Sequence, residues 1–146
     1  MTPRRLARLA GQFALEKKAL DVKILDLRKL SSVCDFFVIC SASVDVQAKA
    51  IADWIIENLR ARGINYWHNE GYQACRWILL DYVDVVVHVF LPEVREFYEL
   101  ERLWGDAKME ELTEETIAAK RPKGGGSGLR RATRISGDGG ENDRNR

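Results

Sequence analysis

The chain has 146 residues, of which 46% are hydrophobic and 31% charged, so it can form the core of one domain of ordinary size. Its formal net charge is +1, but the charge is unevenly distributed. Residues 120–146 hold eight Lys and Arg against three Asp and Glu, which leaves fifteen against nineteen in residues 1–119, that is, +5 and −4. Because nucleic-acid binding rests mostly on clustered positive charge, these values argue against a body whose primary partner is nucleic acid.

Composition also divides the chain near residue 119. Residues 120–146 are rich in Gly and Arg and have almost no apolar side chains, so they cannot bury enough surface to offset the entropy of ordering them. We predict a folded domain over residues 1–119 and a disordered basic tail over residues 120–146.

Three further features bear on the compartment. Cys34, Cys40 and Cys75 are an odd set without close pairing, which is typical of a reducing environment. No apolar run approaches the roughly 20 residues that span a bilayer. The Arg-rich start resembles an organelle transit peptide, but Glu16 breaks that pattern. We therefore expect a cytoplasmic protein with no membrane contact.

Hydrophobic periodicity predicts the elements up to residue 67. In chain order these are a helix over Thr2–Leu20 with Thr2 as N-cap and Pro3 at its first position, strands over Val22–Leu27 and Asp35–Ser41, a helix over Val44–Arg62 capped by Ser43 and ended by Gly63, and a strand over Ile64–Trp67. The succession of strand, helix and strand is the βαβ order.

The second half is organised around a predicted hairpin. Trp77–Leu80 and Val85–Phe90 are short, apolar and rich in β-branched residues, and a turn over residues 81–84 separates them. Both strands are apolar on both faces, which is typical of central strands covered on each side. A helix over Glu93–Lys108 follows, with Phe97, Leu100, Leu103, Trp104 and Ala107 on one side. The chain is thus predicted to be a mixed α/β domain with a central mixed five-stranded sheet flanked by helices.

The residues give little sign of metal or nucleophilic chemistry. His68 and His88 stand singly within predicted strands, and no His, Cys or carboxylate pair has ligand spacing. The alternation around His88 favours a buried, hydrogen-bonded core histidine. No recognisable base accompanies the three cysteines. We expect no metal, no cofactor and no catalytic residue.

A resemblance to a known family rests on a series of short motifs. They are Asp35-Phe36-Phe37-Val38-Ile39, Ala50-Ile51-Ala52-Asp53, Glu70-Gly71, Trp77, Leu80-Asp81, Asp84-Val85, Val87-His88-Val89, Arg95, Phe97-Tyr98, Leu100-Glu101 and Leu103-Trp104. In this order they resemble the ribosomal silencing factor family, also called the Iojap family, over about residues 20–107.

The resemblance implies a fold similar to the nucleotidyltransferase core. Such enzymes place two aspartates, two residues apart, after a glycine and serine loop, and use them to hold Mg²⁺. Here Ser41-Ala42-Ser43 occupies the corresponding loop, but Asp45 is followed two residues later by Gln47, so the pair is incomplete. We expect a protein that is not an enzyme and keep a nucleotidyl transferase as a weaker alternative.

The function that the resemblance implies is steric repression of translation. Members of the family bind the large ribosomal subunit at ribosomal protein L-fourteen and block its joining with the small subunit when nutrients are scarce. A large-subunit assembly factor is the alternative. An apolar sheet face could also pair with itself in a homodimer of the free protein, and the basic tail could add a weak contact with ribosomal RNA.

The predicted contact surface lies in the segment after the hairpin and on the hairpin itself. Interface energy concentrates in buried aromatic side chains and arginine, which selects Trp77, Tyr98, Leu100 and Trp104, with Arg95 and Glu101 as a polar rim. Trp77 and Trp104 fit a place in the core equally well. The sequence does not separate these two readings.

Overall fold

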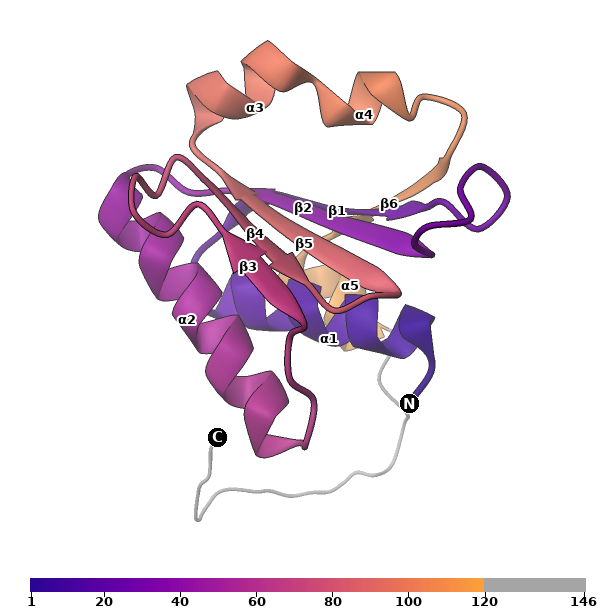
Figure 1. Ribbon diagram of the computed structural model, residues 1–146, viewed down its shortest axis with the longest axis horizontal. Helices are drawn as coiled ribbons and strands as arrows, with labels where there is room; N and C mark the ends of the chain where they lie inside the picture. The colour runs from indigo at the N-terminus through magenta and orange to yellow at the C-terminus, as the bar shows by residue number, and fades with distance from the viewer. Residues whose placement is uncertain (120–146) are drawn as a thin grey trace. The chain divides into compact units, whose positions relative to one another are not determined.

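The computed structural model describes residues 1–119, so the predicted basic tail lies outside the described residues. The chain divides into one unit over Met1–Thr116 and a second over Ile117–Arg146. Only the first unit is described in full. The elements, shown in Figure 1, are α1 (Pro3–Glu16), β1 (Leu20–Asp26), β2 (Phe36–Ser41), α2 (Asp45–Ala61), β3 (His68–Glu70), β4 (Trp77–Asp81), β5 (Val85–Phe90), α3 (Pro92–Tyr98), α4 (Leu100–Leu103), β6 (Lys108–Leu112) and α5 (Glu114–Ala119).

The strands form one mixed sheet in the order β3-β4-β5-β2-β1-β6. β2 and β5 are parallel neighbours, and every other neighbouring pair is antiparallel. The predicted hairpin is β4 and β5, in which Trp77 lies opposite Phe90. The crossover from β2 to its parallel partner contains α2 and then β3 and β4. The mixed α/β class predicted from the sequence is confirmed.

Two hydrophobic layers cover the two faces of this sheet. On one face α1 and α2 bury the larger core, and on the other α3 and α4 lie over a smaller one (Figure 1). Alternation along the hairpin determines which side chain enters which layer. Ile78, Leu80, Val85, Val87 and Val89 enter the larger core, whereas Trp77, Val86 and Phe90 face α3 and α4. We call these the α1/α2 face and the α3/α4 face.

The ends of α1 and α2 confirm some of the predicted helix caps and contradict one. The Thr2 hydroxyl caps α1 by accepting the Arg5 N–H at 3.1 Å, and Pro3 occupies the first helical position, as predicted. Gly63 ends α2 with a φ of +79°. Ser43 does not cap α2: the N-cap is Val44, and the Ser43 N–H donates to Gln47 Oε1 at 2.7 Å.

Two predictions about strands were wrong. The third strand is His68–Glu70, because the Ile64 N–H bonds back to the Leu59 carbonyl and sheet pairing begins only at Trp67. The sheet has six strands, because β6 adds to the outer edge of β1. Of the β6 side chains only Leu112 is buried, so the strand carries almost no alternation signal.

Candidate functional site

The predicted helix over Glu93–Lys108 is broken into two short helices. Glu99 has φ 48° and ψ 53°, the left-handed conformation that ends α3, and α4 starts at the next residue. A left-handed residue cannot continue a right-handed helix, so the chain turns sharply there. Residues 108–112 then leave as β6. The prediction of one long helix is therefore wrong. The prediction that its apolar residues share one side is also wrong. Leu100, Trp104 and Ala107 pack onto the sheet, whereas Phe97 and Leu103 are 78% and 71% exposed.

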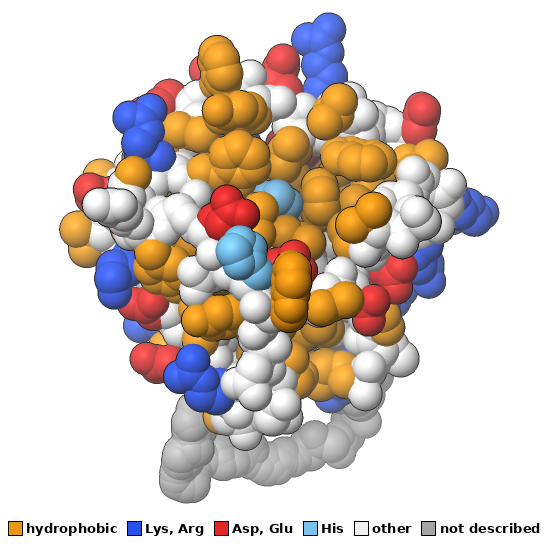
Figure 2. All heavy atoms as spheres, in the orientation of Figure 1, with side chains coloured by type: hydrophobic (Ala, Val, Ile, Leu, Met, Phe, Trp, Pro, Cys, Tyr) orange, Lys and Arg blue, Asp and Glu red, His pale blue; other side chains and the backbone are white. Residues whose placement is uncertain are grey.

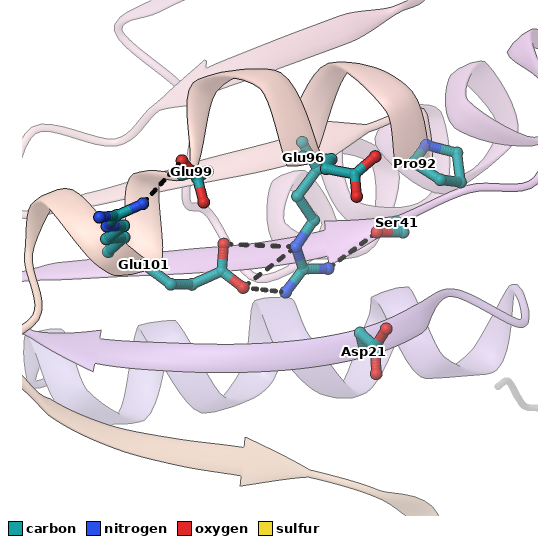
Figure 3. A pocket seen from close by; sticks show the side chains of 8 residues that line it. Asp21, Ser41, Pro92, Glu96, Glu99 and Glu101 are labelled. Atoms are coloured by element: carbon teal, nitrogen blue, oxygen red, sulfur yellow. Dashed lines mark hydrogen bonds and ion pairs between the residues drawn. The ribbon is translucent and has the colours of Figure 1, made fainter.

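A cluster of charges ties the two short helices to the sheet (Figure 3). Arg95 of α3 donates from Nη2 to Glu101 Oε2 at 2.8 Å and from Nε to the same oxygen at 3.2 Å. Its Nη1 donates to the Ser41 hydroxyl at the end of β2 at 2.8 Å. Lys23 of β1 approaches Glu101 at 3.7 Å. We call Arg95, Glu101 and Ser41 the clasp, because it joins α3, α4 and β2.

Electrostatics favours the charged form of this cluster. Burial alone would raise the pKa of Glu101, but the hydrogen bonds and positive charge of Arg95 outweigh it, and the pKa is lowered. Arg95 is only 9% exposed, so its charge depends on Glu101 for compensation. The clasp borders a shallow pocket of about 330 Å³ that is also lined by Asp21, Pro92, Glu96, Glu99 and Arg102.

Aromatic side chains fill the layer beneath α3 and α4. Trp77 lies with its ring centroid 4.8 Å from that of Phe90 and 4.8 Å from that of Tyr98. Trp104 meets Phe37 edge to face at 6.1 Å. Because Trp77 and Trp104 are half-buried, each contributes one side to the core and keeps another accessible. Trp77 and Trp104 therefore belong to the core on one side, and a partner contact through their accessible sides stays a prediction.

His88 lies at the centre of this layer. Its Nδ1 accepts the indole N–H of Trp77 at 3.1 Å, which confirms the prediction of a buried, hydrogen-bonded histidine. Burial lowers the pKa of His88 to about 3, so the ring is neutral at physiological pH. Since Nδ1 is the acceptor, the proton of the neutral ring is on Nε2.

Above the layer, α3 and α4 carry side chains that contact water instead of the core. Phe97 and Leu103 are the most exposed of them, and Tyr98 is 50% exposed. Phe97 and Tyr98 meet edge to face with centroids 5.0 Å apart. Figure 2 shows hydrophobic side chains gathered at the top of the face in view, over α3 and α4. We call Phe97, Tyr98 and Leu103 the apolar ridge.

The six side chains selected from the sequence lie in or beside this region but in three different situations. Tyr98 belongs to the ridge. Trp77, Leu100 and Trp104 are half-buried beneath it. Arg95 and Glu101 form an ion pair with each other in the clasp, so each charge is already compensated within the chain. Sequence reasoning missed Phe97 and Leu103 as surface residues, because only the break at Glu99 turns them away from the sheet. That any of these residues contacts a partner stays a prediction.

The nucleotidyl transferase alternative depended on Ser41, Ser43 and Asp45. Ser41 is buried and bonded to Arg95, and the Asp45 carboxylate accepts the Val46 N–H at 2.7 Å at the exposed start of α2. Within residues 1–119 no group of three or more His, Cys, Asp or Glu side chains is placed to hold a metal ion. Nor does any helix in that range have the length and apolar character needed to cross a membrane.

Fold and ridge together define a class, a mixed α/β domain with an exposed apolar surface on one side of its sheet. A family model described as "Ribosomal silencing factor during starvation" matches residues 1–133. The chain belongs to the ribosomal silencing factor family.

Individual relatives agree with this assignment. The chain is 41% identical over 112 residues to a ribosomal silencing factor RsfS of Halalkalibacterium halodurans, covering 77% of this chain and 96% of the relative. It is 39% identical to that of Bacillus subtilis over the same length, with 77% and 95% covered. A mouse protein named "Mitochondrial assembly of ribosomal large subunit protein 1" is 29% identical over 109 residues, covering 70% of this chain and 48% of the relative.

Solved structures share the fold. A crystal structure of a protein from Chromobacterium violaceum superposes with a TM-score of 0.70 at 34% identity, covering 72% of this chain and 88% of that one. A crystal structure from Bacillus halodurans gives 0.66 at 38% identity, covering 75% and 99%.

Proposed function

We propose that this chain is a cytoplasmic translation repressor that binds the large ribosomal subunit at ribosomal protein L-fourteen and sterically prevents the small subunit from joining. The observation that carries the proposal is the apolar ridge on a chain of the ribosomal silencing factor family. Exposed aromatic and aliphatic side chains grouped on one surface are typical of protein contact sites. Steric exclusion requires no chemical step, so no catalytic residue is invoked.

The contact would be centred on Phe97, Tyr98 and Leu103, with the accessible sides of Trp77 and Trp104 beneath them. Burying large apolar side chains at the centre of an interface supplies most of its binding energy. Leu100, Arg95 and Glu101 would act mainly by holding this surface in shape. The excess of acidic over basic residues in residues 1–119 suits a basic ribosomal protein.

The direct test is sedimentation of the full chain with separated large subunits. We expect the natural chain to travel with the large subunit and the double variant Phe97→Ala, Leu103→Ala to lose affinity by about tenfold or more, as removal of two central contacts should do. Both side chains are mostly exposed, so the variant should fold normally. The matched control is Trp67→Ala, Val46→Ala. It removes two side chains outside the ridge that are 73% and 75% exposed. Equal affinities for the two variants would contradict a contact through the ridge.

A second candidate, assembly of the large subunit, is favoured by the name of the mouse relative. It predicts that loss of the gene leads to accumulation of large-subunit precursors during growth. A silencing factor instead predicts an excess of joined ribosomes in starved cells. Density-gradient profiles of a deletion strain in rich and depleted medium distinguish the two. A homodimer of the free protein stays a further proposal, testable by sedimentation equilibrium.

A further inference from the structure

The excess of acidic residues in the folded domain hides a local cluster of positive charge. Three arginines occupy the first two turns of α1, and at 100° per residue they fall within an arc of about 100°. Arg28 and Lys29 follow the end of β1, which runs beside α1. Lys108 begins β6, where it lies directly opposite Asp26 of β1. We call these six side chains the basic patch: Arg4, Arg5, Arg8, Arg28, Lys29 and Lys108.

Specific contacts hold part of the patch in place. The Arg28 guanidinium donates to both oxygens of Asp26, at 2.9 and 2.7 Å, and Arg4 approaches the same carboxylate at 3.5 Å. Both guanidinium groups also lie over the ring of Phe36, at 5.3 Å for Arg4 and 5.1 Å for Arg28. Such stacking fixes the planes of the two groups while leaving each side chain 51% exposed. One carboxylate thus orders two cations and neutralises one charge.

The neighbouring acids do not cancel the patch. Asp26 pairs with Arg28 and Arg4, Glu110 contacts Arg8, and Asp35 lies within electrostatic range of Arg28. Six basic against these three acidic side chains give +3, and adding Asp84, whose backbone carbonyl accepts the N–H groups of Asp35 and Phe36, still leaves +2. Outside the six basic and three acidic side chains, residues 1–119 hold nine basic and sixteen acidic side chains, or −7. Charge is therefore segregated within the domain, which the net value of −4 conceals.

The chemistry of the patch fits a phosphate backbone. Arginine predominates, and its planar fork of donors matches phosphate oxygens better than the point charge of lysine. Phe36 is buried under Arg4 and Arg28, so it offers no face on which a base could stack. Contact with unpaired bases would need such a face, whereas an RNA double helix presents its phosphates and hides its bases.

We propose that the basic patch is a second contact surface of this protein, which binds the phosphate backbone of double-helical RNA. The choice of RNA over DNA rests on the proposed ribosomal function, whereas the match between the patch and phosphate groups is independent of that function. The patch belongs to α1, the loop after β1 and the start of β6, whereas the ridge belongs to α3 and α4, so the two surfaces can be altered separately.

The test measures binding of a fluorescent RNA hairpin to the full chain by anisotropy at several salt concentrations. The patch variant is Arg5→Glu, Lys29→Glu, which reverses two exposed charges that no ion pair described for the patch uses. Its matched control, Arg60→Glu, Arg76→Glu, makes the same change in net charge at exposed positions of other elements. All three chains keep the same tail, so the tail cannot account for a difference.

We expect the patch variant to lose RNA affinity by tenfold or more and the slope of log K against log salt to fall by about two, as expected for two lost phosphate contacts. The control should change by about twofold or less at physiological salt, where charges are screened beyond about 8 Å. Equal losses in both variants, or no loss in the patch variant, would overturn the proposal.

Leu30 and Val33 are exposed in the loop that carries Arg28 and Lys29, so vesicles with anionic lipid are a necessary second probe. Patch-dependent binding to vesicles with no binding to the hairpin would overturn the proposal in favour of a membrane surface. The ridge variant Phe97→Ala, Leu103→Ala separates this proposal from the proposed function. The ridge variant should keep hairpin binding. If the natural chain binds the hairpin through the patch but does not bind large subunits, only the proposed repressor function is refuted.

Discussion

Arg95 carries a charge that is almost removed from water, and its two partners come from different elements. Losing one partner of such a pair leaves the other charge uncompensated, and the penalty depends on how well water can reach it. The side chain of Glu101 is 22% exposed, whereas that of Arg95 is 10% exposed. The two halves of the clasp should therefore respond unequally to mutation.

We predict that Glu101→Ala destabilises the domain by about 3 kcal/mol and Arg95→Met by about 1–2 kcal/mol, because the stranded arginine is the more buried charge. Urea unfolding of both variants measures the difference. The reverse order would show that packing of the Arg95 stem, and not its charge, dominates.

The clasp should also depend on pH. The pKa of Glu101 is lowered in the folded state, so its stabilisation is fully present above the usual glutamate pKa of about 4.3 and is lost as pH falls through the lowered value. Glu101→Gln should show a flatter decline in unfolding free energy over this acid range than the natural chain.

His88 gives a separate pH dependence at higher pH. Its pKa is about 3 when folded against about 6.5 when unfolded, so between these values the unfolded chain binds the extra proton. Stability should therefore fall with decreasing pH, by about 2 kcal/mol between pH 7 and pH 5. His88→Gln, which keeps an acceptor for Trp77, should remove most of that decrease, as measured by urea unfolding at the two pH values. An unchanged decrease would mean that His88 is solvated.

The turn between α3 and α4 depends on a residue in a conformation that glycine adopts more easily. Glu99 has a φ of 48°, and its ion pair with Arg102 is long, at 3.6 Å, and exposed. We predict that Glu99→Gly stabilises the domain by about 0.5–1 kcal/mol. Glu99→Ala is the control, because it removes the ion pair but keeps the unfavourable φ. A midpoint of thermal unfolding for the glycine variant no higher than that of the alanine variant would contradict the prediction.

Besides its pairing with β1, β6 packs on α1 through Leu112, which lies against Gly11. Leu112 is 2% exposed, and a methyl group added to Gly11 would meet its Cδ1. Leu112→Ala should therefore destabilise by about 2–4 kcal/mol. In the double variant the Gly11→Ala methyl would occupy the vacated space, so its loss should be smaller than the sum of the single losses. Additive losses in urea unfolding would show that the two positions are not in contact.

These elements also show what the sequence could and could not predict. The hairpin, the Thr2 cap and the Gly63 stop follow from local rules of alternation, capping and backbone freedom. The break at Glu99 has no local signal, because glutamate gives no indication of a left-handed conformation. β6 is an edge strand with one buried side chain, so its pairing depends on β1, which is distant in sequence. The position of the ridge depended on the break at Glu99, and so only Tyr98 among its residues was predicted from the sequence.

The described domain carries two kinds of surface on different elements. The α3/α4 face ends in an apolar ridge held by the clasp, and the basic patch belongs to α1, the loop after β1 and the start of β6. The proposed function requires a well-ordered contact surface more than a reactive group, and the clasp joins the two short helices that carry the ridge to each other and to β2.

Steric repression through the ridge can be measured as the fraction of joined ribosomes formed when small subunits are added to large subunits already mixed with the protein. We predict that the natural chain and the Trp67→Ala, Val46→Ala control lower this fraction to the same extent as their concentration rises. The Phe97→Ala, Leu103→Ala variant should need about tenfold more protein for the same effect. If the natural chain binds large subunits but leaves the joined fraction unchanged, steric repression through the ridge is wrong.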